Sequence, residues 1–152
     1  MAKTIVRLDR IANGHVDSFK FATDLEQGTF VSLNALNDND LYTGVAVDLT
    51  KPIVFHVSVP MNYKDGDLEI DYVLPAGVAG RGLVLQKGDI VTITNNGVNG
   101  VPAVNKVLAA EAGQTKGKIY ADAATAVGDV KLICERINVS LAGQAASTYR
   151  VL

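Results

Sequence analysis

The sequence predicts a mainly β protein, either an antiparallel β-barrel or a β-sandwich, with at most one or two short helices. Short runs of alternating apolar and polar residues recur along the chain about 8–12 residues apart, a spacing typical of sandwiches and barrels. Clusters of Gly, Pro, Asn and Asp separate these runs and supply the turns. Strands do not alternate with long amphipathic helices, so the pattern disfavours a βαβ architecture.

The most informative stretch is residues 68–95. In residues 68–74 every second side chain is apolar and acidic residues lie between them, which predicts a strand. Residues 83–86 and 89–94 resume the extended pattern on either side of a turn at Lys87 and Gly88. In the last run the residues predicted to point inward are Val91 and Ile93, and those predicted to point outward are Thr92 and Thr94. A flexible loop without regular structure is predicted between the first two strands, at Pro75, Gly77, Gly80 and Gly82.

Further strands are predicted along the rest of the chain, at residues 29–33, 41–48, 53–59, 104–110, 118–123, 130–137 and 147–152. The run 53–59 alternates most regularly, with apolar side chains on one face and the polar residues His56 and Ser58 on the other. Two Ala-rich stretches, residues 109–112 and 121–126, are candidate short helices because Ala has the highest helix propensity.

The run 130–137 carries apolar residues on both faces, with Ile133 and Ile137 opposite Cys134. A strand that is apolar on both faces is predicted to lie at the centre of a sheet. Cys134 is the only cysteine, so the chain has no internal disulfide, and we expect this residue to be a small buried hydrophobe.

Length and composition predict one β-rich domain, residues 17–152, preceded by an N-terminal arm or edge strand at residues 1–16. A chain of 152 residues removes roughly 70% of its unfolded surface from water on folding. The net charge of −2 lacks the basic surplus of nucleic-acid-binding proteins, so no nucleic-acid partner is expected. No apolar run has the length of a signal peptide or a membrane span, which predicts a soluble protein made inside the cell, without a membrane partner.

No motif indicates catalysis or a cofactor. The glycines at 77–82 lack the Gly-Lys-Ser/Thr ending of a phosphate loop, and strand-like residues follow them where a helix should begin. The acidic run Asp65, Asp67, Glu69 and Asp71 alternates along a predicted strand, which favours a solvated face over a calcium site. His15 and His56 lack the spacing of metal ligands, although a triad containing one of them stays open. We therefore assign no catalytic residues, no metal ligands and no cofactor.

Several segments together resemble the small structural proteins that tailed phages encode beside their major capsid protein. They are VRLDRIANGHV at residues 6–16, QGTFVSL at 27–33, VSVP at 57–60, DYVLPAGVAGRGLVLQKGDIVTITN at 71–95, and a C-terminal strand pair. The chain is similar to head decoration, or cement, proteins. This resemblance implies a β-rich module that sits on the capsid lattice, commonly as a trimer, reinforces it, and has no catalytic residues.

The resemblance implies that the major capsid protein of the same phage is the partner, that a trimer is the favoured homo-oligomer, and that the protein is made in the host cytoplasm and resides on the capsid exterior. Residues 1–12 and 75–88 are the predicted contact regions, because they are apolar or Gly-rich and show no obvious internal partner. The candidate partner-binding residues are Ile5, Arg7, Leu8, Arg10, Ile11 and Arg81.

Two alternatives stay open. The first is another virion component, such as a tail-tube or head-fibre protein, which shares the β-rich, acidic and Trp-free profile. The second is a carbohydrate-binding module or small hydrolase, which needs an aromatic platform or a pair of acids in a cleft. Its candidate aromatic residues are scattered along the chain: Tyr42, Tyr63, Tyr72, Tyr120 and Tyr149.

Overall fold

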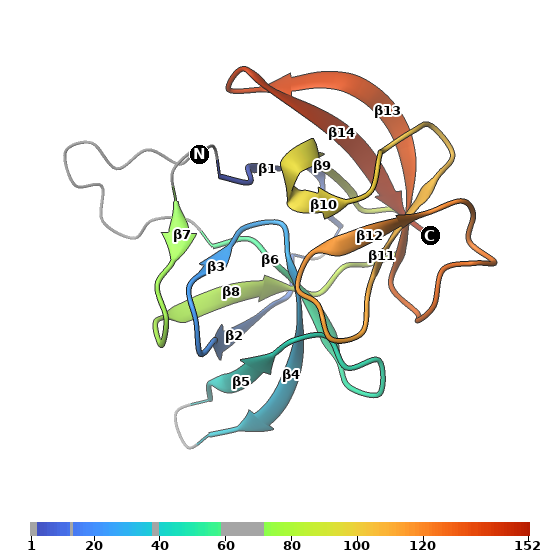
Figure 1. Ribbon diagram of the computed structural model, residues 1–152. Helices are drawn as coiled ribbons and strands as arrows, with labels where there is room; N and C mark the ends of the chain where they lie inside the picture. The colour runs from blue at the N-terminus through green and yellow to red at the C-terminus, as the bar shows by residue number, and fades with distance from the viewer. Residues whose placement is uncertain (1–2, 13, 38–39, 59–71) are drawn as a thin grey trace.

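The computed structural model describes residues 3–12, 14–37, 40–58 and 72–152 (Figure 1). This part of the chain forms fourteen strands and one short 3-10 helix, η2 (Asn95–Gly97). The prediction of a mainly β fold is confirmed. The two predicted Ala-rich helices are wrong: residues 107–110 form strand β11 (Val107–Ala110) and residues 121–126 form turns. Strand β11 is fully buried and pairs with a neighbour on each side, and these tertiary contacts override the helix propensity of Ala.

The larger sheet has seven strands in the order β1-β9-β14-β13-β11-β12-β10. Its strands besides β11 are β1 (Val6–Arg10), β9 (Ile90–Thr94), β14 (Gln144–Val151), β13 (Lys131–Leu141), β12 (Gly117–Tyr120) and β10 (Val98–Asn99). Neighbours are antiparallel except β10 and β12. The prediction that residues 130–137 form a central strand is confirmed, because β13 lies between β14 and β11.

The second unit is a closed barrel of five strands in the order β2-β5-β4-β6-β8. Its strands are β2 (Val16–Lys20), β5 (Tyr42–Val45), β4 (Phe30–Leu36), β6 (Ile53–His56) and β8 (Ala79–Leu83). Two short strands, β3 (Leu25–Glu26) and β7 (Val73–Leu74), pair beside it. The fold therefore combines a barrel with an open sheet packed against it. The predicted strand residues 59 and 68–71 lie outside the described part of the chain.

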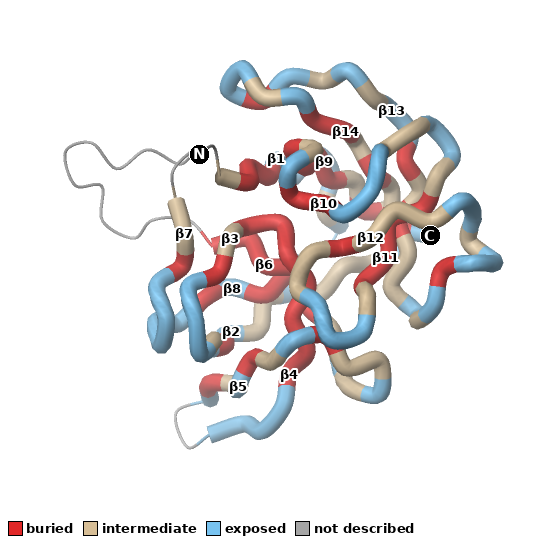
Figure 2. The backbone as a smooth tube through the Cα atoms, viewed as in Figure 1, coloured by how far each residue is buried: buried red, intermediate tan, exposed pale blue. Residues whose placement is uncertain are grey.

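Two apolar cores share the barrel strands. Phe30 and Phe55 lie opposite each other on β4 and β6, with ring centroids 5.4 Å apart, and belong to the cluster between the barrel and the large sheet. The next residues along these strands, Val31 and Val54, belong to the cluster inside the barrel. Because successive side chains of a strand point to opposite faces, β4 and β6 are buried on both faces. Figure 2 shows the buried residues gathered where barrel and sheet meet.

The glycines of β8 do not form a flexible loop, so that prediction is wrong. Gly80 and Gly82 are strand residues that pair with β2 and lie against the barrel interior. A Cβ atom at Gly80 would lie 2.5 Å from Leu74 Cδ2, and one at Gly82 would lie 2.8 Å from Val54 Cβ. Each glycine is therefore required by the close approach of a core side chain. Arg81, between them, lies mid-strand with its side chain exposed, not at a loop tip.

The predicted inward residues of β9 are correct, since Val91 and Ile93 are completely buried. The prediction that Thr92 and Thr94 face solvent is wrong, because both are also completely buried. Their hydroxyl groups are satisfied by neighbouring strands: Thr92 Oγ1 donates to Asp9 Oδ2 over 2.5 Å, and Thr94 Oγ1 accepts from the Ile5 N–H over 3.0 Å. Threonine on β9 thus makes cross-strand hydrogen bonds that sequence alternation does not reveal.

We predict that Gly82→Ala lowers the free energy of unfolding by about 1–3 kcal/mol, because the added methyl group overpacks the barrel against Val54. Urea unfolding followed by circular dichroism measures this difference. Arg81→Ala is the matched control on the same strand, and its effect should stay within about 0.5 kcal/mol because its side chain is exposed. A Gly82→Ala variant as stable as the parent would show that Val54 moves aside freely.

Candidate functional site

The N-terminal segment is integrated into the large sheet. Strand β1 forms one edge of this sheet and pairs with β9. Ile5, just before it, is 7% exposed and packs with Leu141 and Ala146. Val6 is buried in the main core. The premise that residues 1–12 lack an internal partner is therefore wrong for these two, and Ile5 has little surface left for a partner.

Strand alternation gives β1 two different faces. Arg7 lies opposite Thr92 and faces away from the barrel, whereas Leu8 lies opposite the core residue Val91 and faces the barrel side. Leu8 is nevertheless 44% exposed. The register shift between Leu8 and Arg10 is a β-bulge that ends the regular pairing of β1 with β9. Arg10 is exposed and lines neither of the two depressions that flank β1.

The first depression, here called the apolar groove, has a volume of about 490 Å³. It lies between the end of β1 and the barrel and is lined by Leu8, Ile11, Ala12, Gly14, Val16, Val57, Arg81 and Leu83. The groove brings together three predicted contact residues from two distant segments: Leu8 and Ile11 near the N-terminus, and Arg81 on β8. The Ala12 N–H donates to Asp89 Oδ1 over 2.9 Å, which fixes the segment that forms one wall. Within the described chain, the Arg81 guanidinium makes no ion pair or hydrogen bond.

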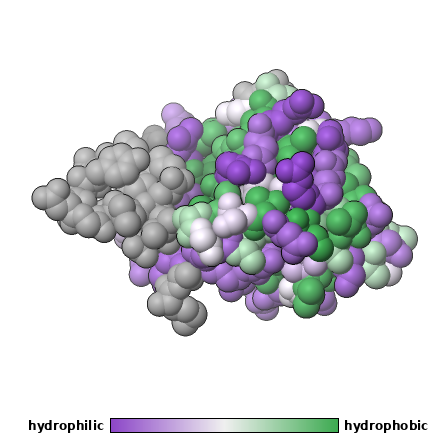
Figure 3. All heavy atoms as spheres, turned by 90° about the horizontal axis from the view of Figure 1, so that it is seen from above, coloured by the Kyte–Doolittle hydropathy of each residue, from purple (hydrophilic) through white to green (hydrophobic). Residues whose placement is uncertain are grey.

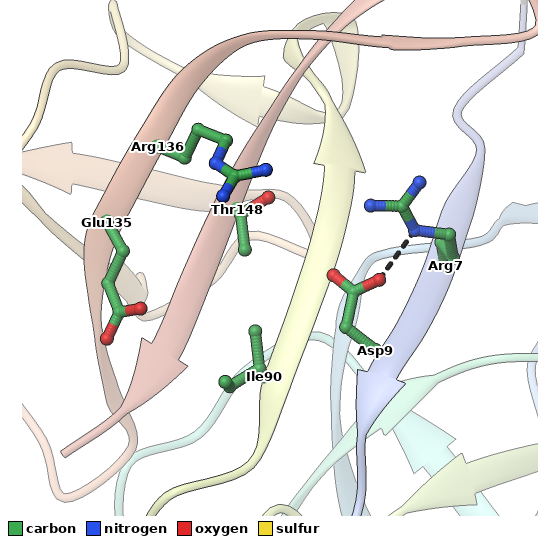
Figure 4. Close-up of a pocket in the computed structure, with 6 residues that line it drawn as sticks. All are labelled: Arg7, Asp9, Ile90, Glu135, Arg136 and Thr148. Carbon is green, nitrogen blue, oxygen red and sulfur yellow. Dashed lines mark hydrogen bonds and ion pairs between the residues drawn. The ribbon is translucent and has the colours of Figure 1, made fainter.

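The second depression, here called the polar depression, lies on the opposite face of the sheet and has a volume of about 360 Å³. It is lined by Arg7, Asp9, Ile90, Glu135, Arg136 and Thr148 (Figure 4). Arg7 Nε donates to Asp9 Oδ1 over 2.5 Å, and the other oxygen of Asp9 accepts from the buried Thr92. Thr92 Oγ1 in turn lies 2.8 Å from Thr148 Oγ1. This network links β1, β9 and β14.

Two β-bulges place Arg136 in the polar depression. Along β13 the register shifts between Cys134 and Arg136 and again between Arg136 and Val139. The first extra residue puts Glu135 and Arg136 on the same outer face, where both line the depression. It also turns Ile137 back toward the cluster that contains Cys134. The prediction that Ile137 lies opposite Cys134 is therefore wrong.

Sequence reasoning missed Glu135, Arg136 and Thr148 as site residues. A signal for the bulge was present, because even positions of this strand are apolar up to Cys134, whereas after it only odd positions are apolar: Ile137, Val139 and Leu141. Such a change of phase in an alternating strand marks an inserted residue.

The polar-face prediction for His56 and Ser58 is wrong, because both residues are buried. His56 Nδ1 lies 2.8 Å from the carbonyl oxygen of Glu26, and His56 Nε2 lies 2.7 Å from Ser58 Oγ. A carbonyl only accepts hydrogen bonds, so Nδ1 carries the proton and Nε2 accepts from the serine. Ser58 Oγ also accepts from the Arg81 N–H over 2.8 Å. A Ser–His pair thus exists, but it lies in the interior and links β6 to β8. It is not a catalytic triad, because the second ring nitrogen of the histidine contacts a backbone carbonyl and not a carboxylate.

The remaining candidates for chemistry are explained by packing or lie at the surface. Cys134 is completely buried, as predicted, and burial raises the pKa of its thiol. His15 is exposed, and its Nε2 lies 3.3 Å from Asp17 Oδ1. No group of three His, Cys, Asp or Glu residues suited to a metal ion occurs within the described ranges. The acidic run at residues 65–71 lies outside them.

The described tyrosines do not form an aromatic platform. Tyr149 is in the main core, Tyr42 packs on the barrel core, and Tyr120 packs on a separate cluster around Val107. Tyr72 is half-buried and directly precedes β7. Tyr63 lies outside the described residues. Seen from above, the surface mixes hydrophobic with hydrophilic side chains (Figure 3). The hydropathy of this face therefore does not single out a binding surface, and we base the candidate sites on the two depressions.

Comparison with protein-family models, with curated proteins and with solved structures finds no match for this chain. Among its described helices, none has the length and apolar character needed to cross a membrane.

We predict that the protein loses stability as the pH falls from 6.5 to 4. Burial lowers the pKa of His56 from 6.5 to about 4, only partly opposed by its hydrogen bond to Glu26. Above pH 6.5 the histidine is neutral in both states. As the pH falls below 6.5 the unfolded chain binds a proton that the folded chain does not, and this costs about 3 kcal/mol by pH 4.

Urea unfolding at pH 7.0, 5.5 and 4.5 measures this loss. His56→Gln should be less stable than the parent at pH 7.0 but should lose much less stability across this range. His15→Gln, which removes the exposed histidine, should keep the full pH dependence. A His56→Gln variant with the parental pH dependence would contradict the assignment.

Proposed function

We propose that this chain is a non-enzymatic structural protein of a virion, which binds the outside of a phage capsid lattice and stabilises it. The observation that carries this proposal is the apolar groove, where Leu8, Ile11 and Arg81 converge beside an edge strand. The partner is the major capsid protein of the same phage, and a homotrimer on the capsid exterior is the favoured assembly. No cofactor is required for this role.

The chemistry of the groove suits a protein partner. Its apolar lining supplies the non-directional part of the binding energy, since removing apolar surface from water contributes roughly 25 cal/mol per Å². Arg81 adds a cation that makes no described internal interaction and is able to bind a carboxylate in a bidentate manner. The edge of β1 offers backbone groups for pairing with an added strand. A symmetric oligomer repeats these contacts, so weak single contacts add up on a lattice.

The interior Ser–His pair supports a non-enzymatic role. Ser58 is 3% exposed and its hydroxyl already serves His56 and the backbone of Arg81. A nucleophile has to reach the atom that it attacks, and a proton acceptor has to lie within hydrogen-bond reach of the substrate. The buried Ser58 cannot reach a substrate as a nucleophile, and the completely buried His56 cannot come within hydrogen-bond reach of one as a proton acceptor.

One observation favours a second candidate, a ring- or tube-forming virion component such as a tail-tube or head-fibre protein. The large sheet ends in two edge strands, β1 and β10, on opposite sides. Pairing of β1 of one copy with β10 of the next is a heterologous contact, and such contacts generate rings or filaments. Self-assembly of the purified protein distinguishes this candidate from capsid binding.

We predict that Leu8→Asp weakens binding to empty capsids of the encoding phage about tenfold or more, because it places a charge in the apolar groove. Co-sedimentation across a range of protein concentrations measures the affinity. Leu36→Asp is the matched control, since Leu36 is also exposed, at 52% against 44%, but lies on the barrel away from the groove. Deletion of residues 1–12 is a poorer test because it removes the buried Ile5 and Val6.

Light scattering of the free protein completes the experiment. A trimer, or a monomer that co-sediments with capsids, agrees with the proposal. Assembly into rings or tubes that do not bind capsids would favour the second candidate over the capsid-binding proposal. A Leu8→Asp variant that binds capsids with the parental affinity would exclude the apolar groove as the contact surface.

A further inference from the structure

The charges in and around the polar depression do not balance. Asp9 is fully used, because one of its oxygens accepts from Arg7 and the other from Thr92. Glu135 forms an ion pair with Arg150. Arg136 lines the same depression as these two carboxylates, yet within the described residues its guanidinium forms no ion pair and no hydrogen bond. One positive charge in this depression therefore has no described counterpart.

The geometry directs this charge toward a ligand position. Arg7 reaches from β1 toward β9, and Arg136 reaches from β13 over β14, so the two guanidinium groups approach the same outer face of the sheet from opposite sides (Figure 4). Ile90 and Thr148 complete the lining, and Thr148 lies beside the Arg136 guanidinium. Thr92 gives its hydroxyl proton to Asp9, so Thr148 must donate to Thr92. The donors left for a ligand are therefore the free N–H groups of the two arginines.

The backbone of β13 is distorted where it carries Arg136. Two bulges bracket this residue, and Asn138 adopts a left-handed conformation with φ 61°. Bulges re-aim side chains next to binding sites, and strained backbone of this kind persists only when the surrounding structure maintains it. The first of these bulges holds Glu135 and Arg136 on one face.

We propose that the polar depression binds the carboxylate of an aspartate or glutamate side chain presented by a partner protein, with Arg136 as the principal contact and Arg7 as the second. A single uncompensated positive charge matches a monoanion. A phosphate dianion would meet the same cation but would be repelled by Asp9 and Glu135, which line the depression. The site is distinct from the apolar groove, and the inference does not depend on the partner being a capsid.

A protein-borne carboxylate fits better than a free small acid. Ion pairs at exposed positions contribute only about 0–1 kcal/mol. An isolated carboxylate held by two exposed arginines would therefore bind very weakly, whereas a partner that also contacts the surrounding sheet retains it by multivalent attachment.

Side-chain NMR of the arginine Nε–Hε groups tests the proposal, with an extended peptide containing one glutamate, titrated to millimolar concentration so that weak binding is measurable, as the probe and its glutamine analogue as the matched control. The glutamate peptide should give saturable shifts at Arg136 and Arg7, whereas the glutamine peptide should give none. Arg136→Gln should weaken peptide binding about fivefold or more, which corresponds to the loss of roughly 1 kcal/mol. Arg10→Gln, an exposed arginine outside the depression, should leave it unchanged.

Inorganic phosphate serves as a competing probe. Tighter binding of phosphate than of the glutamate peptide would overturn the assignment of the ligand. Equal responses to the glutamate and glutamine peptides, or an unchanged affinity of Arg136→Gln, would overturn the site itself. Because no capsid is used, these outcomes are separate from success or failure of the proposed function.

Discussion

The fold depends on one constraint: strands β4 and β6 supply side chains to two apolar cores at once. Phe30 and Phe55 fill the space under the large sheet, and Val31 and Val54 fill the barrel. Each fully buried side chain of this size contributes roughly 1.5–3 kcal/mol. The two cores cannot be uncoupled, because any shift of these strands by one residue exchanges the two sets of side chains. The barrel and the sheet consequently form one packed unit.

This constraint also positions the candidate contact surface. Because the barrel is filled by Val54 and Leu74, β8 can pass close to them only with glycine at positions 80 and 82. That packing fixes Arg81 between the two glycines, and Ser58 holds its backbone N–H from the neighbouring segment. On the other side, the main core buries Val6 and thereby sets β1 against the barrel. The strand residues that line the apolar groove are therefore held in place by core packing, which limits the entropic cost of binding.

Local patterns were enough to predict most of the longer strands, the central place of β13 and the burial of Cys134, because alternation reports directly on which faces are apolar. They failed where contacts with distant segments of the chain decide whether a residue is buried and which conformation it adopts. Gly80 and Gly82 look like loop residues until the side chains of Leu74 and Val54 are placed beside them. His56 looks solvent-facing until Glu26 and Ser58 satisfy its ring nitrogens. Arg136 was missed because a β-bulge changes which face of the sheet the following side chains point to, and strict alternation does not allow for this.

The two depressions flank the same edge strand, and this restricts what a strand-like partner must look like. Leu8 borders the apolar groove on one face of β1, and Arg7 borders the polar depression on the other. A segment added to this edge continues both faces of the sheet, since its own side chains alternate. Toward the groove it would present apolar side chains, and toward Arg7 on the other face of β1 it would present acidic ones. Complementarity with β1 therefore favours an extended segment in which apolar and acidic residues alternate.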